Sequence, residues 1–128
     1  MSEPRPLATT PDPRCRLNTN LETIGDVAVI ELLGESLDAM SSDDVKDELC
    51  GLAVEHPKLV VDLHRITFLD SSGCGALVTA QKRCLEAGGD LRVCNVTGPV
   101  RTVMEIARLS RVLNVYPTRA EAVTTFGR

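Results

Sequence analysis

The segment LVVDLHRITFLDSSGCGALVTAQKRCLEAGGDLRVCNV, residues 59–96, changes its hydrophobic period twice. The run of Leu and Val within residues 58–63 has the composition of a strand that is covered on both faces. Apolar side chains then recur at helical spacing from about Ser72 to Ala87, and residues 90–96 are again typical of a strand. This succession predicts a βαβ unit with two parallel strands and a right-handed crossover.

The helix of this unit is expected to bury one face. Its apolar stripe is predicted to consist of Cys74, Leu77, Val78 and Leu85. Gln81 falls on the same stripe and would need a hydrogen-bond partner there. The pair Gly88-Gly89 is a termination signal, so the helix is expected to end at this point.

The segments around the βαβ unit carry further strand and helix patterns. Residues 17–24 and 27–33 predict an antiparallel hairpin that turns at Gly25-Asp26. Residues 111–116 predict a short closing strand. A hairpin feeding βαβ units implies an α/β fold with a mixed β-sheet, made of the N-terminal hairpin plus parallel strands.

About four helices are expected to pack over this sheet. Besides the helix of the βαβ unit, one is predicted after the caps at residues 41–44, with Val45, Leu49 and Leu52 on one face. Another follows Pro99, with the stripe Val100, Val103, Met104 and Ala107. The last begins at Thr118, which forms a capping box with Glu121.

Length and composition indicate one globular domain. The chain has 128 residues, of which 43% are hydrophobic. Residues 1–15 hold four of the 7 prolines and are expected to be a disordered tail, which leaves residues 16–128 as the domain. The net charge of -4 and the three aromatic residues disfavour nucleic-acid binding, which needs basic surfaces and stacking platforms.

The cysteines and the hydropathy indicate a cytoplasmic protein. There are 5 cysteines and no C-x-x-C pair, which favours free thiols in a reducing compartment. The first residues lack the apolar segment of a signal peptide, and no apolar run is long enough to span a membrane. Cys50, Cys84 and Cys94 are interpreted as small buried hydrophobes.

The stretch LDSSGCG, residues 69–75, connects a strand to the central helix. Binding sites in open α/β sheets form at the carboxyl ends of strands, where this connection lies. Ser71 and Ser72 are therefore placed at a helix N-terminus, with free N–H groups and the positive end of the dipole. Gly73 and Gly75 would leave the first turn bare, so that a partner's backbone could approach. The serines could be a helix cap, a nucleophile or a phosphate acceptor.

The motifs of common enzymes are missing from this stretch. A hydrolase elbow G-x-S-x-G is absent, and nothing in the spacing brings His56 or His64 to Ser72. The sequence SGCGAL lacks the third glycine of a dinucleotide fingerprint. His64 near Asp62 is interpreted as a loop residue, because no credible metal-ligand set surrounds it. No catalytic residue, cofactor or metal is expected.

Residues 59–96 resemble the core of a STAS domain, as found in bacterial anti-sigma-factor antagonists. The sequence GESLDA, residues 34–39, resembles the G-E-x-L-D loop of that family, and the likeness runs from about residue 16 to about 126. The chain departs from the family pattern at Cys74, where Leu is usual, and at MSSDD, residues 40–44, where Thr-Ala is more common. The resemblance implies the fold described above and a binding switch instead of an enzyme.

In that family the second serine of D-S-S-G, here Ser72, accepts phosphate from an anti-sigma factor that has serine kinase activity. A separate serine phosphatase removes the phosphate. The resemblance implies that the unphosphorylated protein binds the anti-sigma factor and frees a sigma factor. Position also favours Ser72 over Ser71, because its hydroxyl is nearer the helix start and can stand out there. Ser71 is expected to remain unmodified.

The expected docking surface combines the two motif loops. It comprises Gly34, Glu35, Leu37, Asp38, Asp70, Ser71, Gly73, Cys74 and Gly75. The protein is expected to be a monomer or weak dimer. Two alternatives remain: a scaffold subunit of a stress-sensing assembly, and an accessory subunit of a transporter. Cys74 could be activated by the helix dipole as a redox thiol, but its place on the apolar stripe favours a buried, inert group.

Overall fold

The computed structural model describes residues 19–127, so the tail expected at residues 1–15 lies outside the described residues. The strands are β1 (Thr19–Ile24), β2 (Val27–Leu32), β3 (Ser36–Leu37), β4 (Lys58–Asp62), β5 (Phe68–Leu69), β6 (Asp90–Cys94) and β7 (Asn114–Tyr116). The α-helices of this part of the chain are α2 (Ser42–Glu55), α3 (Ser71–Glu86), α4 (Gly98–Ile106) and α5 (Arg119–Thr124). Short 3-10 turns cover Leu109–Arg111 and Thr125–Gly127.

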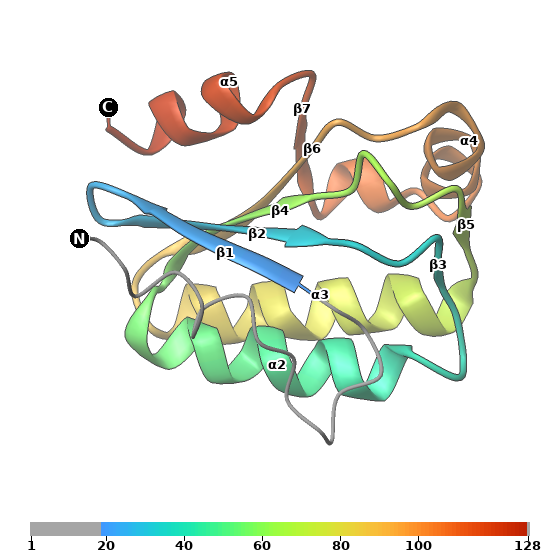
Figure 1. Cartoon of the computed structure of the whole chain (residues 1–128), viewed down its shortest axis with the longest axis horizontal. Coiled ribbons are helices and arrows are strands. Elements are labelled where there is room, and N and C mark those ends of the chain that lie inside the picture. Colours follow the sequence, from blue (N-terminus) through green and yellow to red (C-terminus); the bar gives the residue numbers. More distant parts are fainter. Residues whose placement is uncertain (1–18, 128) are drawn as a thin grey trace.

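The main sheet is mixed, as predicted. Its strand order is β1-β2-β4-β6-β7 (Figure 1). β1 and β2 form the antiparallel hairpin, and every other neighbouring pair is parallel. β4 and β6 are adjacent and parallel, with α3 between them in the chain, so the predicted βαβ unit and the α/β fold class are confirmed.

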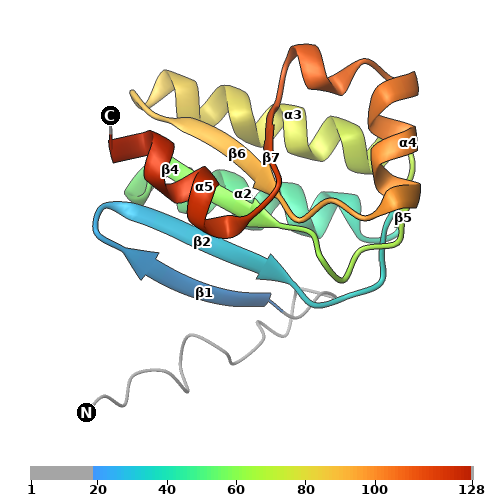
Figure 2. The same ribbon diagram turned by 90° about the horizontal axis from the view of Figure 1, so that it is seen from above.

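Helices cover both faces of this sheet. α2 and α3 lie side by side on one face, and α5 lies on the other (Figures 1 and 2). Successive residues of β2 point to opposite faces, so Ala28 and Ile30 join the core under α2 and α3. Val27 and Val29 join a smaller cluster with Ala122 of α5. This double coverage explains why the central strands are continuous apolar runs instead of alternating ones.

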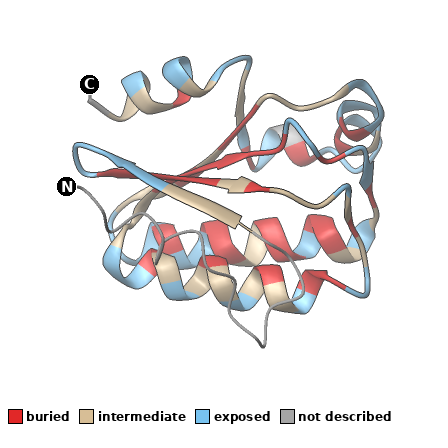
Figure 3. Cartoon of the chain, viewed as in Figure 1, coloured by how far each residue is buried: buried red, intermediate tan, exposed pale blue. Residues whose placement is uncertain are grey.

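The buried face of α3 differs in part from the predicted stripe. Cys74 and Leu77 are buried as expected, but Leu85 is 54% exposed and Cys84 is buried in its place. Figure 3 shows buried and exposed segments alternating along the helices below the sheet. One residue along a helix turns the side chain by about 100°, and the sheet lies against the side of Cys84. Gln81 is buried, and its side-chain amide donates to the carbonyl of Val112 at 2.6 Å, which provides the predicted partner.

One further helix position was also wrong. Ala107, expected on the apolar stripe of the helix after Pro99, is exposed because α4 ends at Ile106. Val100 and Met104 of the same stripe are buried as predicted. The capping interaction expected at the start of α5 is present, since the Thr118 hydroxyl accepts a hydrogen bond from the backbone N–H of Glu121 at 3.2 Å.

A second sheet, which the sequence pattern did not predict, lies at one end of the molecule. β3 and β5 pair in parallel, with Ser36 opposite Phe68 and Leu37 opposite Leu69. These strands have two residues each, too short for a detectable period. They lie at the end of the molecule where α3 begins (Figure 1). The small sheet therefore joins the two loops that the sequence motifs identified.

Candidate functional site

The loop at residues 34–38 and the start of α3 are connected by backbone hydrogen bonds. The N–H of Thr67 donates to the carbonyl of Glu35 at 2.7 Å, and the N–H of Asp70 donates to the carbonyl of Leu37 at 3.3 Å. These bonds continue the pairing of β3 with β5. Two motifs that are more than thirty residues apart in the chain thus form one continuous surface.

Asp70 holds this arrangement together. One carboxylate oxygen accepts from the N–H of Gly73 at 3.0 Å, which makes Asp70 the N-cap of α3. The other oxygen accepts from the N–H of Ala39 at 3.2 Å, so the same side chain ties down the loop before α2. Asp70 is only half exposed and both its oxygens have partners within the protein. Its main structural role is therefore to fix the geometry between the two loops.

Ser71 and Ser72 are the first two residues of α3. The hypothesis that one of them is the helix cap is wrong, because Asp70 occupies the cap position. Ser71 is exposed and Ser72 is half-buried, so the positional reason for preferring Ser72 is wrong: Ser71 is nearer the helix start and is the more exposed of the two. Neither hydroxyl makes a hydrogen bond to any residue between 19 and 127. Neither hydroxyl therefore contributes a hydrogen bond to the fold of the described residues.

The two glycines of the motif differ in their surroundings. A Cβ atom on Gly73 would lie 2.4 Å from the carbonyl oxygen of Leu37 and 2.7 Å from a methyl group of Leu69. A Cβ atom on Gly75 would meet nothing within 4 Å. Gly73 thus allows the chain to pack against itself, whereas Gly75 leaves space at the surface.

Burial corrects part of the docking surface expected from the sequence. Leu37, Gly73 and Cys74 are buried, so they cannot touch a partner in this conformation. They lie beneath the surface and determine its shape. The exposed or half-exposed members are Gly34, Glu35, Asp38, Asp70, Ser71 and Gly75.

The thiol of Cys74 lies in this buried layer. Burial raises the pKa of the Cys74 thiol, and the nearby charge of Asp70 raises it further. The backbone hydrogen bond to the sulfur acts in the opposite direction and is weaker. A thiol with a raised pKa and little access is a poor nucleophile, which favours the inert interpretation over the redox one.

We expect thiol labelling of the native protein to follow burial. The experiment uses a Cys15→Ser variant, so that four cysteines remain. Cys50 is half-buried and should be the first of them to react with a disulfide reagent at pH 8. Cys74 should react more slowly by at least about tenfold, because both access and thiolate fraction are reduced. Cys84 and Cys94 should be slowest, since burial raises the pKa of each to about 12. Mass spectrometry of labelled peptides over time measures the order, and Cys74 reacting before Cys50 would restore the redox hypothesis.

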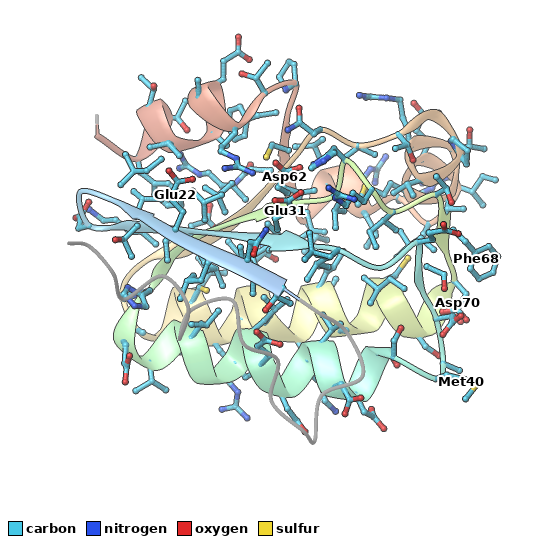
Figure 4. All side chains as sticks on the ribbon, in the orientation of Figure 1. Glu22, Glu31, Met40, Asp62, Phe68 and Asp70 are labelled. Atoms are coloured by element: carbon cyan, nitrogen blue, oxygen red, sulfur yellow. The ribbon has the colours of Figure 1, made fainter. Side chains whose placement is uncertain are left out.

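Two exposed apolar side chains, which sequence reasoning missed, flank Asp70. Met40 is 74% exposed and Phe68 is 54% exposed. Figure 4 places Met40, Phe68 and Asp70 at the same end of the molecule. Large exposed apolar groups beside polar ones are typical of protein-binding surfaces. The alternation of Phe68 with the buried Leu69 is a signal that could have identified one of them from the sequence.

A pocket of about 250 Å³ lies beside Ser72, between the first turns of α2 and α3. It is lined by Ser42, Asp43, Lys46, Ser72, Gly75, Ala76 and Thr79. The amino group of Lys46 is 3.8 Å from a carboxylate oxygen of Asp43, and both side chains are well exposed. The candidate site thus has an acidic and apolar rim, free hydroxyls and one lysine.

A second polar cluster lies on the face of the sheet that α5 covers. Asp62, only 1% exposed, accepts from the guanidinium of Arg119 at 2.7 and 3.2 Å and from the backbone N–H of His64 at 3.0 Å. Burial would raise the pKa of Asp62, but these hydrogen bonds outweigh it and lower the pKa. Glu22 and Glu31 lie nearby and also pair with Arg119 (Figure 4).

This cluster fastens α5 to the sheet. His64 belongs to the loop after β4, as expected, and its ring bridges Asp62 and Glu31 at 3.0 and 3.2 Å. The described residues contain no group of side chains suited to hold a metal ion. They also contain no helix with the length and hydropathy needed to cross a membrane.

Comparisons with known proteins agree with this geometry. The family model described as STAS domain matches residues 18–122. A relative from Paenibacillus polymyxa, named anti-sigma F factor antagonist, is 30% identical over 112 residues, which cover 84% of this chain and 93% of the relative.

Solved structures with the same fold include regulators and transporters. The anti-sigma factor antagonist SpoIIAA in its unphosphorylated form has a TM-score of 0.68 at 23% identity, with 82% of this chain and 92% of that chain covered. The murine anion transporter Slc26a9 has a TM-score of 0.66 at 18% identity, with 84% of this chain but only 19% of that chain covered. At these identities the likeness establishes the fold alone.

Proposed function

Since this chain belongs to the STAS domain family, we propose that it is an anti-sigma-factor antagonist controlled by phosphorylation of Ser72. The unphosphorylated protein binds an anti-sigma factor that has serine kinase activity. The anti-sigma factor then releases the sigma factor that it holds. The partner kinase phosphorylates Ser72, and a serine phosphatase reverses the modification. The protein itself is a binding switch without catalytic residues or a cofactor, and it acts in the cytoplasm as a monomer or weak dimer.

The observation that carries this proposal is the junction of the two motif loops. Asp70 and the β3–β5 pair hold residues 34–40 against the start of α3, so that Ser72 lies at the edge of one rigid surface. The relative from Paenibacillus polymyxa, of which 93% is covered, bears the name of such an antagonist. A surface already fixed by hydrogen bonds loses little entropy when it binds.

The docking surface in this proposal has apolar anchors and an acidic rim. Met40 and Phe68 would supply buried contact area, and they replace the buried Leu37 and Cys74 of the sequence-based assignment. Glu35 and Asp43 are exposed beside them and Asp38 is half-exposed. This combination fits a partner surface with an apolar depression surrounded by basic side chains.

Phosphorylation would change this surface without a large rearrangement. The Ser72 oxygen forms a bond to the γ-phosphorus of ATP as the bond to the β-phosphate oxygen breaks, and the hydroxyl proton is released. The product carries about -1.5 to -2 additional charges near neutral pH. Burying this group against the partner without a matching cation would cost roughly 3 kcal/mol, which is about a hundredfold in affinity.

Phosphopeptide mapping tests the assignment. We expect an anti-sigma kinase from the source genome, incubated with ATP, to phosphorylate Ser72 and not Ser71. Ser72→Ala should abolish phosphate incorporation, and the variant should continue to bind the partner in the presence of kinase and ATP. Its free energy of unfolding should change by less than about 0.5 kcal/mol, because the Ser72 hydroxyl makes no hydrogen bond within the described residues. Ser72→Glu should weaken binding less than phosphate does, since its charge is smaller.

Ser71→Ala is the matched control and should incorporate phosphate like the parent protein. Phosphate on Ser71 with Ser72 unmodified would contradict the site. The alternatives give other outcomes: a scaffold subunit would be phosphorylated but stay in a very large assembly, which size-exclusion chromatography detects. An accessory subunit of a transporter would take no phosphate on either serine.

A further inference from the structure

The pocket beside Ser72 has features that the proposed partner interface does not explain. It lies between the N-terminal turns of two helices that pack side by side, α2 and α3 (Figure 1). From α3 it receives only uncharged residues, Ser72, Gly75, Ala76 and Thr79. From α2 it receives Ser42, Asp43 and Lys46. Its one cation is therefore Lys46, and its one anion is Asp43.

Ser42 is an unusual member of this lining. It is only 7% exposed, yet its hydroxyl makes no hydrogen bond to any of the described residues. Among the described residues the only fully buried side-chain nitrogen or oxygen without a partner is the Nε of Arg92, so the Ser42 hydroxyl keeps some contact with solvent. A polar group in this position, at the edge of a pocket, is ready to donate to an acceptor that enters the pocket.

Lys46 is held only weakly in the present state. Its amino group is 3.8 Å from Asp43, at the outer limit of an ion pair, and the Asp43 side chain is 88% exposed. Such an exposed pair contributes little free energy and can exchange partners. A phosphate carries more charge and more acceptor oxygens than a carboxylate, so it would compete well for Lys46.

We propose that the phosphate on Ser72 folds into this pocket and is bound by the protein's own Lys46 and Ser42. The inference rests on the proposed phosphorylation of Ser72 and adds where the phosphate goes. The pocket is lined by residues from the N-terminal halves of α2 and α3, where the helix dipole is positive and favours an anion. Asp43 gives up its ion pair with Lys46 and turns toward water. The phosphorylated state is then a distinct, ordered surface.

This arrangement has a consequence for regulation. The phosphate is shared between helices α2 and α3 of the antagonist, so a phosphatase must first draw it away from Lys46. A glutamate at position 72 has a shorter reach, a smaller charge and fewer acceptor oxygens than phosphoserine. Ser72→Glu would therefore reproduce only part of the phosphate charge, and its carboxylate would not reach the position of the phosphate beside Lys46.

The experiment uses the full chain with phosphoserine inserted at position 72 during translation, so it needs no kinase. The pH titration of the ³¹P signal reports the charge around the phosphate. We expect the midpoint to lie below that of a phosphopeptide covering residues 68–77. Lys46→Ala should raise the midpoint by about 0.5 pH unit, and Asp43→Asn should lower it, because one removes a cation and the other an anion.

Lys82→Ala is the matched control, since Lys82 is an exposed lysine on α3 that does not line the pocket. It should leave the midpoint unchanged. Thermal melting verifies that each variant is folded, and Lys46→Gln provides a second neutral replacement. A midpoint equal to that of the peptide, or one that Lys46 does not influence, would overturn the inference. That result would contradict the bound position of the phosphate but not the proposed function. Conversely, if kinases failed to phosphorylate Ser72, the proposed function would be contradicted, and this titration would be unaffected.

Discussion

Replacing Gly73 by alanine is expected to lower the free energy of unfolding by about 2–3 kcal/mol. The added methyl group would lie 2.4 Å from the carbonyl oxygen of Leu37 and 2.9 Å from the Leu37 side chain. The nearest atom is backbone, so the overlap is relieved only if β3 moves away from α3. That movement would also disturb the junction of the two loops, and we expect partner binding to weaken together with stability.

Gly75→Ala is the matched control within the same helix. Space around this position is open, and alanine is the better helix former, so the variant should be more stable by about 0.5–1 kcal/mol. Urea denaturation of both variants measures the two effects. Opposite signs at two glycines of one motif are the expected result, and equal small effects would mean that β3 and α3 are not packed as described.

Arg119→Ala is expected to cost about 2–3 kcal/mol of unfolding free energy. The substitution removes both hydrogen bonds that the Arg119 guanidinium donates to the Asp62 carboxylate, which is 1% exposed, and a buried charge that loses its ion-pair partner is strongly destabilising. We place the figure below the 3–5 kcal/mol of a fully buried pair because the Arg119 side chain is 32% exposed. Chemical denaturation at pH 7 measures the loss.

Arg65→Ala is the comparison variant for this cluster. Arg65 is 56% exposed and pairs with Glu31 at 3.2 Å. Its removal should cost less than about 1 kcal/mol, as expected of a solvated ion pair. If the two arginines proved equal, the buried carboxylate of Asp62 would not be the reason for the effect.

The cost of Arg119→Ala should depend on pH. In the parent protein the hydrogen bonds lower the pKa of folded Asp62 below the unfolded value of about 3.9. Asp62 therefore stabilises the fold above that value, and this contribution is lost as the pH falls through the folded pKa. In the variant the Arg119 hydrogen bonds, the strongest of the effects that lower this pKa, are absent, so the pKa of folded Asp62 lies closer to its unfolded value. The difference between the two proteins should thus be largest near neutral pH and shrink in acid.

Most elements of the fold could be predicted because their signals are local. The hairpin, the central βαβ unit and the cap of α5 at Thr118 depend on period and on residues within one turn of each other. The errors occurred where a choice was made by distant parts of the chain. Leu85 and Cys84 are both apolar, and only the position of the sheet decides which of them is buried.

The start of α3 shows the same limit. Asp70, Ser71 and Ser72 are all good cap residues, so the sequence alone could not say which one caps the helix. The pairing of β5 with β3 fixes the backbone at Asp70, whose carboxylate then reaches Gly73 and Ala39. The two serines are left without a structural bond, which is the condition that makes either of them available for modification.

The α/β class, the order of the main elements and the two motif loops could be predicted because hydrophobic period and turn residues are properties of short segments. Contacts across the fold were needed to show that Gly73 lies beneath the surface, that Met40 and Phe68 are exposed on it, and that Lys46 shares a pocket with Ser72. These facts depend on how α2, α3 and the small sheet approach one another. Contacts between segments that are far apart in the chain leave no period in the sequence from which they could be predicted.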